Sequence, residues 1–404
     1  MDQIRKNILW NALGNTAYNL LQWLITVEVT HLSGFETAGV LAIAMSLSLT
    51  LRSVSYFGVR DFQVTDSKNS FSHSDYLSLR CVTCLASLLM CTAVCVISSY
   101  SREVFTAVML FMLFRISEAF SDLFRGIMQK NERLDLSGAA LLIRAVIFTV
   151  SFFLGYLLRG SLTDGLLLMS LSSLAAVAVT DIPMSGMAHK NALKITFINI
   201  TAIARQTLPM FVFTLETAII LNTPKYFLSL FSDNEAVGIY SSVFSLALIL
   251  QGLFQYVYTP FITAFSALET NREYSRIKKL AGKIFAVFLA MTLLFLIISI
   301  LFGETAMTVV YGKHGSYTRI MIPAVVSVCL FSATNFLSLL AVVKREMSML
   351  IKIHTLSAAV FIFSEIVLIP TLGINGASYG VIISALFACI FLSIICFNNL
   401  KSEP

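Results

Sequence analysis

Charged side chains are scarce in this 404-residue chain. Only 12% of its residues are charged, whereas 57% are hydrophobic, and the mean hydropathy is +0.84. Soluble globular proteins carry about a quarter charged residues, so this chain has too few to cover a soluble surface of its size. The composition excludes a soluble enzyme, a nucleic-acid-binding domain and a disordered chain. It predicts an all-α polytopic membrane protein.

Common signatures of catalysis and cofactor binding are also missing. The sequence contains neither a P-loop nor a G-x-S-x-G motif, which argues against ATP hydrolysis by this chain and against serine hydrolysis. Its five histidines are scattered, and its seven cysteines lie in or beside apolar runs without the spacing of a metal site. We therefore expect no metal and no cofactor, and we interpret the cysteines as small packing residues.

Twelve apolar runs are long enough to cross a bilayer, which requires roughly 20 residues per helix. Their approximate cores are 8–29, 37–57, 80–99, 104–124, 137–158, 161–181, 206–223, 237–265, 283–302, 319–343, 350–370 and 377–399. The run at 237–265 contains Pro260, so we expect a tilted or kinked helix there. The first run is interrupted by asparagines and is not followed by a small-residue cleavage site, so we expect a retained membrane helix rather than a signal peptide.

Lysine and arginine are unevenly distributed between the predicted turns. With the N-terminus inside, 20 of the 28 basic residues lie in inside turns and 5 in outside turns. The positive-inside rule then places both termini on the cytoplasmic side of the membrane. The outside turns are short, about a dozen residues at most. Because membrane glycosyltransferases and polymerases usually carry catalytic residues in a large outer loop, we expect a protein that is not an enzyme.

A basic, turn-rich segment at 182–205 separates six predicted spans from six. Two halves with an even number of spans share their orientation in the membrane. They would therefore be related by an axis along the membrane normal, as in transporters with parallel repeats. We predict two six-helix bundles, 1–190 and 191–404, around a central cavity.

Amide side chains recur along one face of two predicted spans. The first span carries Asn11, Asn15, Asn19 and Gln22, and the eighth carries Gln251, Gln255, Thr259 and Thr263. Spacings of three and four residues place each set on a single helical face. Such a stripe can hydrogen-bond a neighbouring helix or line a water-filled cavity. Four amides in succession favour the cavity, so we predict that both stripes contact a hydroxyl-rich substrate.

Arginines inside the first-half spans give the sharpest signal. Arg52, Arg115 and Arg144 fall within spans, and Arg60 lies at the cytoplasmic mouth. A charge at mid-depth costs at least about 2.5–3.5 kcal/mol, so it must face a cavity or a partner. Guanidinium keeps its charge when buried and binds phosphate bidentately, which predicts a path for a pyrophosphate head group. Alternatively, carboxylates hold the arginines for structural reasons, and Glu118 has the i, i+3 spacing for pairing with Arg115.

Intramembrane carboxylates are candidates for coupling transport to protons or sodium ions, because a buried glutamate can carry a proton at neutral pH. The candidates are Glu28, Glu118, Asp122, Glu216 and Glu365. Glu216 is the first choice because it lies in the middle of its span. The alternative for each is a protonated side chain that only hydrogen-bonds a neighbour.

Local sequence resembles one superfamily of transporters. The second inside turn, Phe57–Asp66, reads FGVRDFQVTD and is similar to a G-x-R-x-aromatic-Q-x-S/T-D pattern of capsule and O-unit flippases. The segments Arg205–Pro209, Val237–Tyr240 and Pro370–Ala377 also resemble that family. With twelve spans and cationic first-half helices, the chain resembles the multidrug/oligosaccharidyl-lipid/polysaccharide flippase superfamily, in its polysaccharide transporter (Wzx-type) branch.

The resemblance implies a flippase that moves undecaprenyl-pyrophosphate-linked oligosaccharides from the inner to the outer leaflet for O-antigen or capsule synthesis. It also implies alternating access, with an ion gradient as the energy source. Glycosyltransferases and a polysaccharide polymerase would be its functional neighbours, and lipids and the lipid-linked oligosaccharide its partners. Two alternatives stay open: a drug or metabolite exporter of the same superfamily, and a membrane polysaccharide polymerase or ligase.

Overall fold

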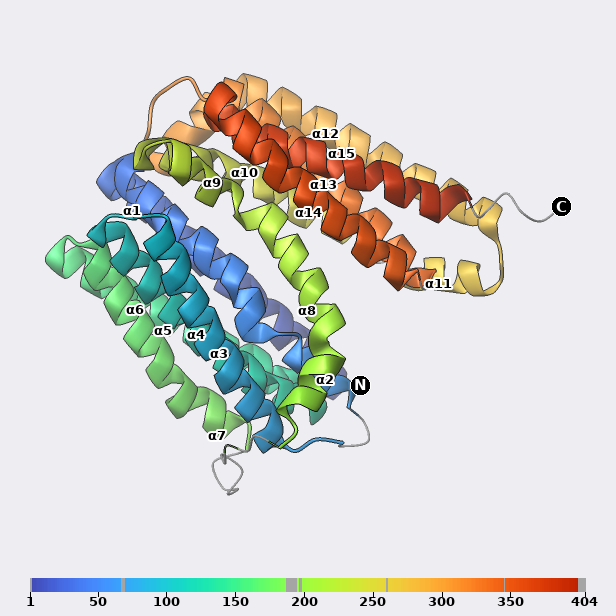
Figure 1. Cartoon of the computed structure of the whole chain (residues 1–404), viewed down its shortest axis with the longest axis horizontal. Helices are drawn as coiled ribbons and strands as arrows, with labels where there is room; N and C mark the ends of the chain where they lie inside the picture. The colour runs from blue at the N-terminus through green and yellow to red at the C-terminus, as the bar shows by residue number, and fades with distance from the viewer. Residues whose placement is uncertain are drawn as a thin grey trace. The chain divides into compact units, whose positions relative to one another are not determined.

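The computed structural model describes residues 2–66, 70–186, 195, 198–258, 261–344 and 346–398. Within these ranges the chain forms helices and no strand (Figure 1). The helices group into two compact units, Met1–Ala218 and Ile219–Pro404. The predicted boundary between residues 190 and 191 falls in a stretch, 187–194, that lies outside the described residues, so it stays a prediction.

The first unit begins with a helix that is bent in the middle. α1 runs from Asp2 to Tyr56, and Gly34 interrupts it with φ 84° and ψ −178°. A positive φ at this angle is accessible to glycine because it lacks a Cβ. The bend divides α1 into two arms, and these arms coincide with the two spans predicted at 8–29 and 37–57. One helix therefore supplies two membrane crossings.

The remaining helices of the first unit follow in chain order. They are α2 (Val59–Thr65), α3 (His73–Ile97), α4 (Arg102–Lys130), α5 (Leu134–Arg159), α6 (Leu162–Ala176) and α7 (Ile182–Met184). A π-helical turn at Val177–Asp181 joins α6 to α7. α8 (Ile200–Asn222) starts in this unit and ends in the second one.

The second unit contains seven further helices. They are α9 (Pro224–Phe231), α10 (Asn234–Tyr258), α11 (Ile262–Thr270), α12 (Tyr274–Tyr311), α13 (Thr318–Val343), α14 (Met347–Leu372) and α15 (Ile374–Asn398). The run predicted at 237–265 is divided here, because α10 ends at Tyr258 and α11 begins at Ile262. Pro260, where a kink was expected, lies outside the described residues.

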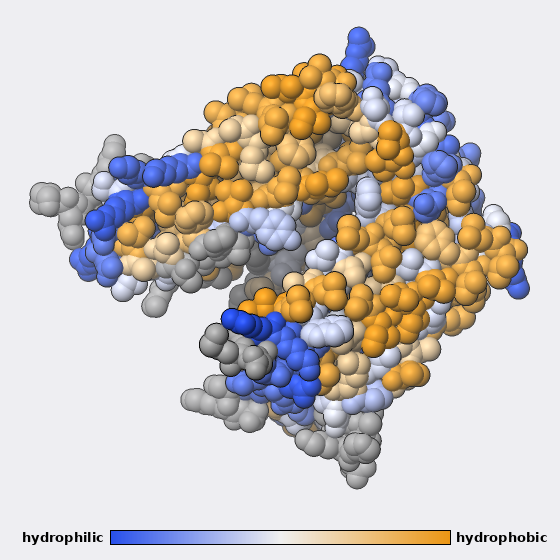
Figure 2. Space-filling model, turned by 180° about the vertical axis from the view of Figure 1, so that it is seen from behind, coloured by the Kyte–Doolittle hydropathy of each residue, from blue (hydrophilic) through white to orange (hydrophobic). Residues whose placement is uncertain are grey.

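Length and hydropathy identify the membrane spans. Ten helical stretches of the described chain are long and apolar enough to cross a membrane, and one of them, Arg5–Val64, contains both arms of α1. A shorter apolar helix at Met210–Asn222 completes the twelve predicted crossings. Apolar side chains cover the flanks of the helices, and hydrophilic side chains gather toward their ends (Figure 2). The predicted all-α polytopic membrane protein is confirmed.

Close backbone contact sets the position of the first arm of α1. This helix packs along α5 and α4, and α5 packs in turn along α6 (Figure 1). A Cβ on Gly138 would lie 2.2 Å from the carbonyl oxygen of Trp10, and a Cβ on Gly14 would lie 2.2 Å from that of Gly138. Small residues let two membrane helices approach this closely. The approach brings the asparagines of α1 next to the charged side chains of α4 and α5.

Gly138→Ala is expected to lower the thermal unfolding temperature of the purified protein by several degrees. The added methyl group meets the backbone of α1, which cannot move aside without separating the two helices. Gly282→Ala is the control, because a Cβ on that helical glycine meets nothing within 4 Å. If both variants melt at the wild-type temperature, the contact between α1 and α5 does not limit stability.

A cationic cavity in the first unit

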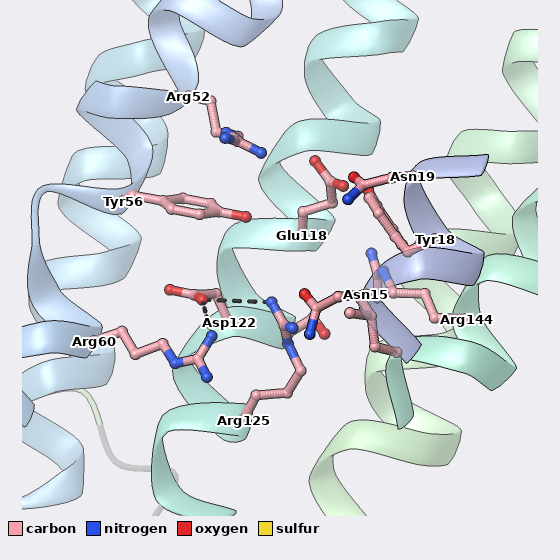
Figure 3. Close-up of a pocket in the computed structure, with 12 residues that line it drawn as sticks. Asn15, Tyr18, Asn19, Arg52, Tyr56, Arg60, Glu118, Asp122, Arg125 and Arg144 are labelled. Carbon is pink, nitrogen blue, oxygen red and sulfur yellow. Dashed lines mark hydrogen bonds and ion pairs between the residues drawn. The ribbon is translucent and has the colours of Figure 1, made fainter. Parts of the chain in front are cut away.

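A cavity of about 250 Å³ lies among the helices of the first unit (Figure 3). Its lining residues come from α1, α2, α4 and α5: Asn15, Tyr18, Asn19, Arg52, Tyr56, Arg60, Glu118, Ser121, Asp122, Arg125, Leu141 and Arg144. The bend in α1 allows both of its arms to take part. Arg52 and Tyr56 of the second arm lie across the cavity from Asn15 and Asn19 of the first arm.

One carboxylate, that of Asp122 on α4, holds three arginines. Its Oδ1 accepts from Arg60 Nη1 at 3.0 Å and from Arg125 Nη2 at 3.5 Å. Its Oδ2 lies 3.4 Å from Nη2 of Arg80, a fully buried residue of α3. The first two contacts are drawn in Figure 3. Asp122 therefore connects α2, α3 and α4 through charge-assisted hydrogen bonds.

A second buried pair depends on the π-helical turn after α6. Arg144 of α5 is buried, and its Nη1 donates to Oδ2 of Asp181 at 3.3 Å. Its Nη2 donates to Ser173 at 2.6 Å and also to Ser117. Asp181 is the last residue of the π-helical turn. Irregular turns of this kind occur frequently at functional sites.

Arg115, the predicted mid-depth arginine, is fully buried behind the cavity wall. Its Nη1 donates to Glu118 Oε2 at 2.6 Å, so the predicted i, i+3 pair is confirmed. Its guanidinium also lies over the ring of Phe111 at 5.0 Å. With its amide oxygen turned toward Arg115, Gln22 accepts from Nη2 at 2.8 Å. Arg115 is not among the lining residues, whereas its partner Glu118 is.

Arg52 differs from the other arginines because no salt bridge holds it within the described part of the chain. Its guanidinium carbon lies 5.1 Å from the ring centroid of Tyr56, in a cation–π contact. In Figure 3 its end group points into the space between Tyr56 and Glu118. Arg52 therefore presents an unneutralised guanidinium to the cavity.

The cavity has a surplus of positive charge. Four arginines and two carboxylates line it. When Arg80, Arg115 and Asp181 are added as the salt-bridge partners of lining residues, six guanidinium groups share three carboxylates. Low-dielectric walls strengthen such a field and draw anions toward it. Chemically, the arrangement suits a multivalent anion such as a phosphate ester.

The four predicted amides of α1 do not all face the cavity. Asn15 and Asn19 are exposed and line the cavity. Asn11 instead accepts through its Oδ1 from Asn15 Nδ2 at 3.0 Å, and Gln22 faces Arg115. The structure thus brings two of the four amides to the cavity. Their contact with a substrate stays a prediction.

The other predicted site residues lie outside this lining. Gln251 and Gln255 belong to α10 of the second unit, Thr259 lies outside the described residues, and the position of the Thr263 side chain is likewise not described. Glu28 is half-buried on α1, and Glu216 is buried on α8. Glu365 on α14 is completely buried. Their roles in substrate binding or ion coupling stay predictions.

The turn that follows α2 is held by its own polar residues. Asp66 accepts hydrogen bonds from the N–H groups of Ser70 at 3.0 Å and Phe71 at 3.3 Å, and from the Tyr76 hydroxyl at 2.9 Å. Burial by itself would raise the pKa of Asp66, but these hydrogen bonds outweigh it and hold the pKa below its ordinary value. The end of the FGVRDFQVTD motif therefore shapes the turn, while Arg60 within it reaches the cavity.

Several members of the site were missed by the sequence-based prediction. Arg80 and Arg125 were counted with the inside turns, yet both lie within helices and contact Asp122. Asp181 stood at the end of the span predicted at 161–181 and was not singled out, although it is buried against Arg144. The i, i+3 spacing of Asp122 and Arg125 could have revealed one contact. Tyr56 and Asp181 carry no comparable signal.

Comparisons with known proteins agree with this architecture. No family model matches the chain. The capsular polysaccharide biosynthesis protein CapF of Staphylococcus aureus is 22% identical over 95% of this chain and 97% of its own length. The solved structure of the lipid II flippase MurJ, in an inward closed conformation, superposes with a TM-score of 0.76 at 12% identity, covering 98% of this chain and 90% of that one.

A second solved structure is an inward-facing multidrug resistance MATE transporter of the MOP superfamily. It has a TM-score of 0.66 and 13% identity, covering 98% of this chain and 99% of that one. The chain has the fold of the multidrug/oligosaccharidyl-lipid/polysaccharide flippase superfamily. The fold predicted from the sequence is thereby confirmed, and it is shared by a lipid II flippase and a multidrug transporter.

Asp181→Ala is expected to reduce the free energy of unfolding by about 3–5 kcal/mol, because it leaves the buried Arg144 guanidinium without its counter-charge. Denaturation of the purified protein measures the change. Asp164→Ala is the control, since Asp164 pairs at the surface with the exposed Arg159 and should lose less than about 1 kcal/mol. Equal losses in the two variants would contradict a structural role for the Arg144–Asp181 pair.

Proposed function

We propose that this protein is a flippase for a lipid-linked oligosaccharide. Its substrate would be an undecaprenyl-pyrophosphate-linked repeat unit, moved from the inner to the outer leaflet of the bacterial cytoplasmic membrane for capsule or O-antigen assembly. The observation that carries the proposal is the surplus of guanidinium groups around the cavity, together with the unneutralised Arg52. A pyrophosphate supplies the compact, multivalent negative charge that such a cavity attracts.

The neighbouring residues suit the rest of such a substrate. Asn15 and Asn19 offer amide donors and acceptors to sugar hydroxyl groups on the wall opposite Arg52. The polyprenyl tail would remain in lipid, beside the apolar flanks of the helices. Resemblance over nearly the full length to a capsular polysaccharide biosynthesis protein supports a polysaccharide precursor as the cargo.

The alternative within the superfamily is a drug or metabolite exporter. Structural likeness to a multidrug transporter is the observation that favours it. An exporter of organic cations needs acidic cavity charge, whereas six guanidinium groups share three carboxylates here. The sign of the charge therefore favours the anionic, lipid-linked substrate. Efflux of cationic dyes by the purified protein, with no movement of lipid-linked sugars, would favour the exporter.

Arg52→Ala is expected to abolish flipping while the protein still folds, because Arg52 forms no salt bridge whose loss would leave a buried carboxylate unpaired. The measurement follows a fluorescent undecaprenyl-pyrophosphate oligosaccharide in proteoliposomes, scored by its access to an added sugar-modifying enzyme. Arg159→Ala removes an exposed arginine of the same unit and should flip at the wild-type rate. Wild-type flipping by Arg52→Ala would refute the role of the cavity.

Glu365 is the best-supported candidate for proton coupling. The carboxyl is completely buried, and neither oxygen has a hydrogen-bond partner in the described structure. An unpaired carboxylate is costly to bury, so we expect this side chain to carry a proton. Glu365→Gln keeps the shape and cannot release a proton. We expect the variant to fold normally and to lose the acceleration of flipping by a proton gradient, measured in the same proteoliposomes. An undiminished response to the gradient would exclude Glu365.

A further inference from the structure

The three arginines around Asp122 are held in different ways. Arg80 is fully buried, and its Nη1 donates to the carbonyl oxygen of Ser55 at 2.7 Å, so it is anchored independently of Asp122. The side chains of Arg60 and Arg125 are 23% and 12% exposed, and both line the cavity. Arg60 forms one further hydrogen bond, in which its Nη2 donates to Oε1 of Gln129 at 2.8 Å. Two of the three guanidinium groups can therefore meet a ligand in the cavity.

Asp122 is the carboxylate that forms salt bridges with all three guanidinium groups, and Asp61 on α2 adds a second negative charge near Arg60 and Arg80. Asp122 supplies a single negative charge to Arg60, Arg80 and Arg125 together, and its own side chain is buried at their centre. Its oxygens accept the hydrogen bonds that a bound anion would accept from these arginines. A carboxylate and a phosphate group present similar oxygens to guanidinium, so they compete for the same donors.

We propose that Asp122 is an internal counter-anion, which competes with the substrate's pyrophosphate for Arg60 and Arg125. This inference rests on the proposed function for the identity of the anion. When the pyrophosphate enters beside Arg52, it takes over hydrogen bonds from the two cavity arginines. When the substrate leaves, Asp122 recaptures them and so favours release. Asp122 is a positioning residue in this scheme, because it acts on the substrate through the arginines.

This competition has a signature that a merely structural residue does not share. Removing the charge of Asp122 frees the two guanidinium groups for the ligand, so anion binding tightens. The same change removes the group that helps to expel the anion, so flipping slows. A residue that only stabilised the fold would weaken binding and flipping together when it was replaced. Competition by Asp122 therefore predicts that the two measurements move in opposite directions.

The experiment measures the binding of inorganic pyrophosphate to the purified full chain by titration calorimetry at constant ionic strength, with wild type beside Asp122→Asn. We expect binding to tighten roughly tenfold, because hydrogen bonds to charged groups are the strong class. Flipping of the fluorescent lipid-linked oligosaccharide is expected to slow at least about fivefold in the same variant. Tighter pyrophosphate binding by the variant, with no flipping by the wild type, would support the counter-anion and refute the proposed function.

Asp135→Asn is the matched control. Asp135 is also a buried carboxylate held by two basic residues, Lys6 at 3.4 Å and Arg133 at 3.0 Å, yet it does not line the cavity. Its replacement should leave pyrophosphate binding unchanged. Unchanged or weaker binding by a folded Asp122→Asn protein, or equal tightening by both variants, would overturn the proposal.

A second comparison applies if Asp122→Asn does not fold. Arg60→Gln combined with Asp122→Asn keeps the net charge of the wild-type cavity, and its reference is Arg60→Gln alone, which has one positive charge less. Arg125 then remains for the competition. We expect the double variant to bind pyrophosphate several-fold more tightly than Arg60→Gln. Equal or weaker binding by the double variant would overturn the proposal in the same way.

Discussion

The first unit is organised by an imbalance of buried charge. Six guanidinium groups share three carboxylates within a set of apolar helices. Each carboxylate pairs with at least one arginine, and removing it would leave a guanidinium group without its counter-charge in a low-dielectric interior. The contacts join α2, α3 and α4 at Asp122, and they join α5 to the turn after α6 at Asp181. The salt bridges that hold the helices together thus contain more arginines than carboxylates, and this excess makes the cavity positive.

The sequence predicted the class and the spans well, because both depend on local signals. Apolar runs of about 20 residues mark membrane helices whatever their neighbours are. Even the bend at Gly34 was foreseen in effect, since the two arms of α1 were predicted as separate spans. The misplacement of Arg80 has a simple origin. Helix boundaries are uncertain by a few residues, and this arginine stood at the predicted edge of its span.

The pairing of side chains could not be predicted from the sequence, except for residues three or four positions apart on one helix. Arg115 and Glu118 are three residues apart, so their pairing could be predicted. Arg144 and Asp181 are 37 residues apart, and only the folded arrangement of α5 and α6 brings them together. The amides of α1 show the same limit. Periodicity placed them on one face, but the neighbouring helices decide that Asn15 meets the cavity and Gln22 meets Arg115.

The π-helical turn at Val177–Asp181 makes the sequence after α6 depend on the sequence of α5. It contains one residue more than a regular α-helical turn would, and that surplus residue sets the register of Asp181 against Arg144. Losing a residue there would restore a regular helix and rotate Asp181 by roughly 100° around its axis. A descendant of this protein that shortened the turn would therefore have to give up the arginine on α5 as well, so the two features should be inherited or lost together.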